Sequence, residues 1–308
     1  MSRKYNTEFA LNSYVTWGAL LQQGDFDYLK IPEGKNPQIY VIGKRPRITC
    51  DSNSVHLLDD GIVGTALIRK NEMDQTLDFK LPTSSSDNSV VLEIPYPYTN
   101  IVIKSNDKKG QVGISTILAL QSDLGSEILD LEILYVGQSL SGSDKYSIRN
   151  RIENHSTLQN IYSEAIRNFP GDEIWIGLFD FDMQIITSIN GITEATATPE
   201  EENAHIERFF STVISDQQMV NFTEAALIRY FQPAYNKIYK NSFPDPAHST
   251  YSSCYDLEVN MVFVSLSLDC IRCRAYSQKV SPAIEHGAEF NLYSIDDRKS
   301  MLDFSDLG

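Results

Sequence analysis

Residues 224–236 read Glu-Ala-Ala-Leu-Ile-Arg-Tyr-Phe-Gln-Pro-Ala-Tyr-Asn and place an acidic residue, a helix end and an irregular turn in one short segment. The apolar spacing predicts a helix over 222–231 that ends before Pro233, because proline cannot continue a helix. Asn236 follows in the turn. Glu224 has two interpretations, a metal ligand or a residue that closes a capping box with Asn221 at the start of the helix.

A tyrosine precedes a glycine at the end of an apolar strand, in Leu134-Tyr135-Val136-Gly137. Gly137 lets the backbone turn sharply and is a supporting position, while Tyr135 can present its hydroxyl at the turn. Such tripeptides are common, so a buried strand tyrosine is the alternative interpretation.

The segment Arg149-Asn150-Arg151-Ile152-Glu153-Asn154-His155 has helical spacing. Arg151 and His155 are four residues apart and therefore share one face of the predicted helix. Arg149 and Glu153 form a second pair at this spacing, for which we expect a surface salt bridge of small energetic value. The alternatives are a surface arginine and a histidine near the last carbonyls of a helix.

Taken in order, Tyr-x-Gly, Arg-x-x-x-His and Glu-x-x-Leu-Ile followed by Pro-x-Tyr-Asn resemble the GIY-YIG nuclease superfamily. The resemblance covers roughly residues 110–240 of 308. It implies an α+β fold, with a GIY-YIG-like three-stranded antiparallel sheet and flanking helices. The family's first motif, Gly-Ile-Tyr, is expected on the preceding hairpin strand, where the best match is Gly113-Ile114-Ser115. Ser115 then stands at the position of the first tyrosine.

The resemblance implies a metal-dependent endonuclease of the restriction, repair or phage-defence kind, whose site residues converge. Glu224 would hold a Mg²⁺ or Mn²⁺ ion, and Arg151 would neutralise charge on the phosphoryl oxygens. Tyr135, His155 or both would position and deprotonate the water, and Asn236 would brace the site. Because the first tyrosine is replaced, the alternative is a catalytically weak or inactive module that binds nucleic acid or a protein partner.

The regions outside the resemblance read as β-rich. Residues 1–108 contain short strands separated by polar turns, and we interpret them as a recognition unit. Residues 109–243 form the nuclease-like unit, with strands at 112–120, 128–136 and 173–181 and a helical insert at about 183–220. Residues 244–308 form a β-rich C-terminal extension.

The net charge of −15 counts against a protein that coats DNA, because phosphate contacts need Lys and Arg. Residues 1–108 are nearly balanced, with 12 Lys+Arg against 13 Asp+Glu, so a local patch must supply nucleic-acid contacts or a protein partner must supply basic surface. The sequence has no apolar run long enough for a membrane span and four scattered cysteines, which makes the cytoplasm the default location. The expected nucleic-acid contacts, most simply to DNA, are Lys44, Arg45, Arg47, Lys145 and Arg149.

Overall fold

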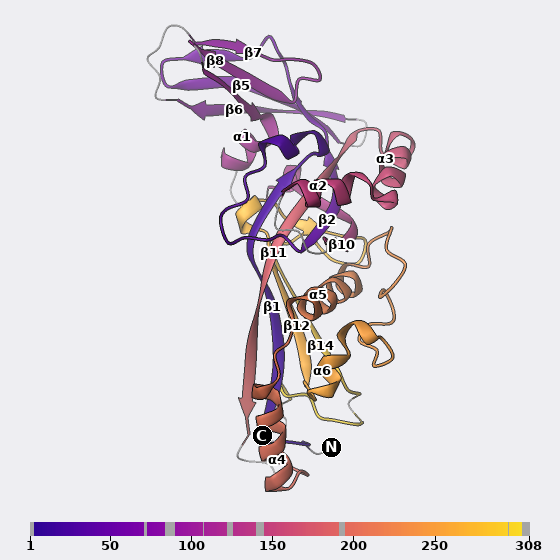
Figure 1. Cartoon of the computed structure of the whole chain (residues 1–308). Helices are drawn as coiled ribbons and strands as arrows, with labels where there is room; N and C mark the ends of the chain where they lie inside the picture. Colours follow the sequence, from indigo (N-terminus) through magenta and orange to yellow (C-terminus); the bar gives the residue numbers. More distant parts are fainter. Residues whose placement is uncertain are drawn as a thin grey trace.

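The computed structural model describes residues 3–70, 73–83, 90–106, 108–121, 126–139, 145–190, 195–294 and 296–303. It confirms an α+β protein whose centre is a seven-stranded mixed sheet in the order β13-β10-β2-β11-β1-β12-β14 (Figure 1). Four neighbours, β10, β2, β11 and β1, pair antiparallel, and β12 lies parallel to β1. The strands are β1 (Thr7–Leu21), β2 (Ile39–Pro46), β10 (Leu131–Gln138), β11 (Asp172–Ile189), β12 (Met261–Ser267), β13 (Ala275–Tyr276) and β14 (Glu285–Asn291).

A β-rich module is inserted between the adjacent strands β2 and β10 and lies at the upper end of the molecule in Figure 1. It contains two small antiparallel sheets, which are followed by a helix and a short 3-10 turn. Two strands that form one antiparallel pair are therefore separated by residues 47–130 of the chain. The elements are β3 (Ile48–Cys50), β4 (His56–Leu58), β5 (Gly61–Lys70), β6 (Met73–Pro82), β7 (Val91–Glu93), β8 (Asn100–Ser105), β9 (Lys108–Gly113), α1 (Ile114–Gln121) and η2 (Glu127–Leu129).

The central sheet takes strands from all three segments that the sequence separates, residues 1–108, 109–243 and 244–308. Two local predictions are wrong. The expected strand at 112–120 is mostly helix α1, because Ile114, Ile117 and Leu118 are buried at helical rather than alternating spacing. The expected helical insert at 183–220 begins as strand, since β11 continues to Ile189 before helix α4 (Pro199–Ser211) starts.

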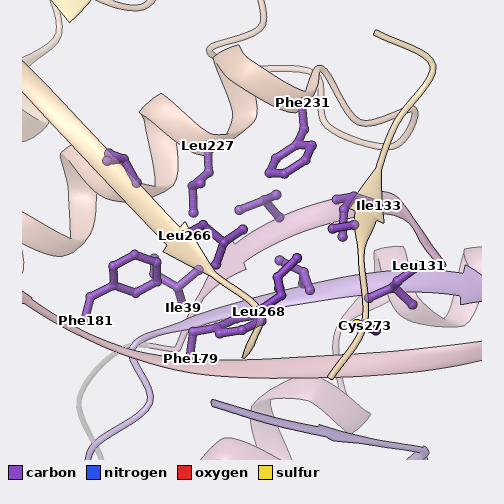
Figure 2. Packing of buried hydrophobic residues seen from close by; sticks show 14 of the residues in the cluster. Ile39, Leu131, Ile133, Phe179, Phe181, Leu227, Phe231, Leu266, Leu268 and Cys273 are labelled. Atoms are coloured by element: carbon purple, nitrogen blue, oxygen red, sulfur yellow. The ribbon is translucent and has the colours of Figure 1, made fainter. Parts of the chain in front are cut away.

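Helices cover both faces of the central sheet. One face packs against α2 (Lys145–Glu153), α3 (Ser156–Asn168) and the turn η1 (Gln23–Tyr28); the other packs against α5 (Asp216–Phe231). Strand β2 alternates between them, with Tyr40 and Ile42 in the α2–α3 cluster and Ile39 in the α5 cluster. In Figure 2, Leu227 and Phe231 of α5 point toward the sheet. The remaining short elements are η3 (Ser249–Tyr251), α6 (Ser252–Asp256) and η4 (Asp269–Ile271).

Candidate functional site

Two tyrosines from neighbouring strands lie side by side over a glycine. Tyr40 on β2 is the register partner of Gly137 on β10, and its ring centroid is 6.0 Å from that of Tyr135. A Cβ atom on Gly137 would lie 2.7 Å from Tyr40 Cζ and 2.7 Å from Tyr135 Cε1. Both rings therefore occupy space that any other residue at 137 would fill, which explains the glycine of the Tyr-x-Gly pattern.

His155 completes an aromatic group with these tyrosines. It stands between α2 and α3, as the residue before the first turn of α3. Its Nε2 lies 3.5 Å from the Tyr135 hydroxyl, at the outer limit of a hydrogen bond, and its ring centroid is 6.1 Å from that of Tyr40. Its Nδ1 is buried and has no hydrogen-bond partner within the described parts of the chain. The imidazole is thus held by packing and faces the phenol through Nε2.

Glu224 reaches the same place from the opposite layer. Helix α5 begins at Asp216, and Ser215 forms its capping box with Gln218. Glu224 therefore lies in the middle of the helix, so the capping interpretation is wrong. Instead, its Oε2 accepts a hydrogen bond of 3.0 Å from Nε2 of Gln138, the last residue of β10. The carboxylate is turned toward the strand end that carries Tyr135.

The charge of Arg151 acts on all of these groups. This exposed residue lies on α2, one turn before His155, and its guanidinium favours the ionised forms of Glu224, Tyr135 and Tyr40 while opposing protonation of His155. The structure thus brings together the four predicted residues Tyr135, Arg151, His155 and Glu224 and adds Tyr40.

Burial is the largest influence on the protonation of each group. It raises the pKa of Glu224 to about 7, against the opposing effects of Arg151 and of the hydrogen bond from Gln138. Burial also raises the pKa of Tyr40 and of Tyr135, with further contributions from the neighbouring tyrosine and from Glu224, respectively. The pKa of His155 is lowered, first by burial and then by Arg151. At neutral pH both phenols carry their protons and the imidazole is uncharged.

The Asn236 side chain forms two hydrogen bonds with the backbone of strand β10. Its Oδ1 accepts from the backbone N–H of Val136 at 2.9 Å, and its Nδ2 donates to the Val136 carbonyl at 2.8 Å. Both bonds are buried. One side chain thereby fixes the backbone between Tyr135 and Gly137, across about a hundred residues of sequence.

Ser115 does not lie on a strand that pairs with β10. It is a residue of helix α1 in the inserted module, so the prediction that it takes the place of a first tyrosine is wrong. The strand that pairs antiparallel with β10 is β2, which begins with Ile39-Tyr40. Tyr40 was not predicted because the partner strand of β10 was expected close by in the sequence. The sequence signal for this strand was the apolar run from Ile39 to Ile42, whose second residue is Tyr40.

Most of the expected nucleic-acid contacts are engaged within the protein. The ammonium group of Lys44 lies 2.6 Å from Asp172 and 3.2 Å from Glu132. Arg45 is buried, with its guanidinium 3.6 Å from the centre of the Trp175 ring. Lys44 and Arg45 are thus engaged inside the protein and do not form an exposed basic patch with Arg47.

The other predicted contacts differ in exposure. Arg47 is half-exposed and lies 3.4 Å from Glu173. Arg149 makes the expected salt bridge with Glu153 at 2.7 Å and a second one with Asp27 at 2.8 Å. Lys145 begins α2, but its side chain lies outside the described part of the structure.

A comparison of the chain with protein-family models, curated proteins and solved structures finds no match. Within the described residues, no three His, Cys, Asp or Glu side chains gather to form a metal site of their own. No helix in the same residues is both long and apolar enough to cross a membrane.

Proposed function

We propose that this protein is a metal-dependent phosphodiesterase that cleaves nucleic acid in the manner of GIY-YIG nucleases. The observation that carries the proposal is the meeting of Tyr40, Tyr135, His155 and Glu224, from four separate elements, around the charge of Arg151. Tyr40 supports the catalytic form of the proposal over the inactive one. It supplies a tyrosine on the strand paired with that of Tyr135, where the resemblance requires one.

His155 is the best candidate for the general base. An uncharged imidazole can accept a proton near neutral pH, whereas phenols with raised pKa values keep theirs. With its proton on Nδ1, His155 presents the Nε2 lone pair toward the Tyr135 hydroxyl. A water bound at the two tyrosine hydroxyls would be oriented by them and lose its proton to His155.

Arg151 stabilises the reaction electrostatically. Its guanidinium is exposed and therefore free to contact a phosphate, and it needs no rearrangement to place positive charge beside the tyrosines. Positive charge fixed where negative charge develops lowers the barrier more than charge that must be brought in.

The donor set fits a hard divalent cation. The Glu224 carboxylate is partly buried and accepts a hydrogen bond from the neutral Gln138 amide, so a bound cation would offset the desolvation penalty of its negative charge. A Mg²⁺ or Mn²⁺ ion held by Glu224 would keep most of its waters, polarise the phosphate and stabilise the leaving oxygen.

Cleavage of duplex DNA, single-stranded DNA and RNA oligonucleotides in Mg²⁺ tests the proposal. Glu224→Ala is expected to abolish cleavage, and Tyr40→Phe to reduce it strongly, because each removes a group at the reacting centre. Glu207→Ala is the matched control, since Glu207 is exposed in the middle of α4. Retention of full Mg²⁺-dependent cleavage by Glu224→Ala would overturn the proposal.

A partner-dependent form of the same function is favoured by one further observation. Lys44 and Arg45 are engaged inside an acidic protein, which leaves little basic surface along β2 to attract a polyanion. Cleavage that requires a basic partner protein would identify this form, and the Glu224→Ala result would be unchanged by it.

A further inference from the structure

A row of four amide and carbonyl groups runs from the surface to Glu224. The Thr250 carbonyl accepts from Nδ2 of Asn221 at 2.7 Å, and Oδ1 of Asn221 accepts from Nε2 of Gln217 at 2.9 Å. The same Nε2 donates to Oε1 of Gln138 at 3.1 Å, and Nε2 of Gln138 donates to Glu224 at 3.0 Å. The row joins the turn η3, helix α5 and the end of strand β10.

The chemistry of its two ends fixes the direction of every amide in the row. A backbone carbonyl and an ionised carboxylate can only accept hydrogen bonds. Asn221 must therefore turn its NH₂ group toward Thr250, and Gln138 must turn its NH₂ group toward Glu224. Both amides then present oxygens to Gln217, which satisfies them by giving one hydrogen of its NH₂ group to each.

We propose that Gln217 is a positioning residue that sets the orientation of the Gln138 amide and, through it, of the Glu224 carboxylate. The inference rests on the proposed role of Glu224 as the cation ligand. Without a donor at position 217, Gln138 is free to turn over, and its oxygen then meets the carboxylate. Two oxygens that both accept repel each other, so the carboxylate leaves the orientation in which it holds a cation. Outer partners that orient a metal ligand commonly change affinity by about 10–100-fold.

Substitutions at position 217 distinguish two possible controls of the cation affinity. One is the charge that position 217 adds near the cation, and the other is the direction in which the Gln138 amide points. Gln217→Glu adds a negative charge near the cation but removes the donor, whereas Gln217→Lys adds a positive charge and keeps donors for both neighbours. Charge alone predicts tighter cation binding by Gln217→Glu and weaker binding by Gln217→Lys. The direction of the Gln138 amide predicts weaker binding by Gln217→Glu and nearly unchanged binding by Gln217→Lys. Gln217 is exposed, so these changes leave the buried core untouched.

The affinity for Mn²⁺ is measured directly from the electron paramagnetic resonance signal of the free ion, without nucleic acid. We expect Gln217→Glu and Gln217→Leu to bind about threefold to tenfold more weakly than the wild type, and Gln217→Lys to stay within about twofold of it. Gln184→Glu and Gln184→Lys repeat the charge changes at an exposed position of β11, and we expect both to bind as the wild type does.

Two outcomes overturn the inference, and they can be told apart. If Glu224→Ala loses Mn²⁺ but the three Gln217 variants follow charge alone or bind as the wild type does, the positioning role fails and the proposed function stands. If Glu224→Ala binds Mn²⁺ as the wild type does, both fail. Weakening by Gln217→Glu together with retention by Gln217→Lys supports the positioning role.

Discussion

The Glu224 carboxylate should destabilise the folded protein above neutral pH, so its removal should stabilise the fold. Glu224→Gln keeps the shape of the side chain and an oxygen that can accept from Gln138, but it removes the charge. Burial raises the pKa of Glu224 from 4.5 to about 7. This difference corresponds to about 3.4 kcal/mol between the two protonation states. Because Glu224 is only partly buried and solvent screens its charge, we expect a gain of about 2 kcal/mol.

The direction of the pH dependence follows from the pKa of Glu224, which is higher in the folded chain than in the unfolded chain. Below pH 4.5 Glu224 is protonated in both the folded and the unfolded chain, so the variant and the wild type should be equally stable there. Between pH 4.5 and 7 the unfolded chain loses the proton while the folded chain keeps it, and the wild type loses stability as the pH rises. Above pH 7 the full cost is present, so the gain from Glu224→Gln should level off.

Urea unfolding in the presence of a chelator, at pH 4.5 and at pH 8.5, measures this gain. Glu207→Gln makes the same chemical change at an exposed position of α4 and should shift the unfolding free energy at neither pH. A Glu224→Gln protein that is no more stable than the wild type at pH 8.5, or equally more stable at both pH values, would refute the reasoning. Added Mg²⁺ should stabilise the wild type at pH 8.5 and leave the variant unchanged.

Three further substitutions test individual parts of the site. Arg151→Ala should lower the cleavage rate by about 10²–10³-fold, measured under single-turnover conditions, while Arg167→Ala on the exposed end of α3 should not. Gly137→Ala should lower the unfolding free energy by about 1–3 kcal/mol, because the new methyl group lies 2.7 Å from both tyrosine rings, whereas Gly24→Ala meets no atom within 4 Å and serves as the control. Asn236→Ala should cost about 2–4 kcal/mol in urea unfolding, since it leaves a buried N–H and a buried carbonyl without partners.

Local patterns predicted the helical parts of the site well. The helix expected from the spacing of Arg149 to His155 is observed, since this segment forms the last part of α2 and the turn before α3. The end of α5 before Pro233 was also expected, because proline is a local signal. Its start was placed too late, although Ser215 and Gln218 form a capping box that the sequence displays. That error alone produced the capping interpretation of Glu224.

Local sequence patterns could not predict the contacts between segments that are distant in the chain. Tyr40 joins the site because β2 pairs with β10 across an inserted module, and the register of that pair depends on the whole sheet. Arg45 and Arg47 look alike in sequence, but only Arg45 is buried, against Trp175 on the neighbouring strand β11. The sign of a residue's charge can be read from the sequence, but its exposure depends on which strand becomes its neighbour.

The protonation states of the site suggest how a protein with a net charge of −15 could approach a polyanion. Burial moves four groups that interact with Arg151 toward their uncharged forms: Glu224 toward its protonated form, the two tyrosines away from phenolate, and His155 toward neutral imidazole. Near pH 7 an exposed guanidinium therefore stands among groups that carry little opposing charge. The same burial leaves Glu224 ready to exchange a proton for a divalent cation, which would make the site more positive when a phosphate arrives. Local desolvation would thus reduce the negative charge around Arg151, although the protein as a whole is strongly acidic.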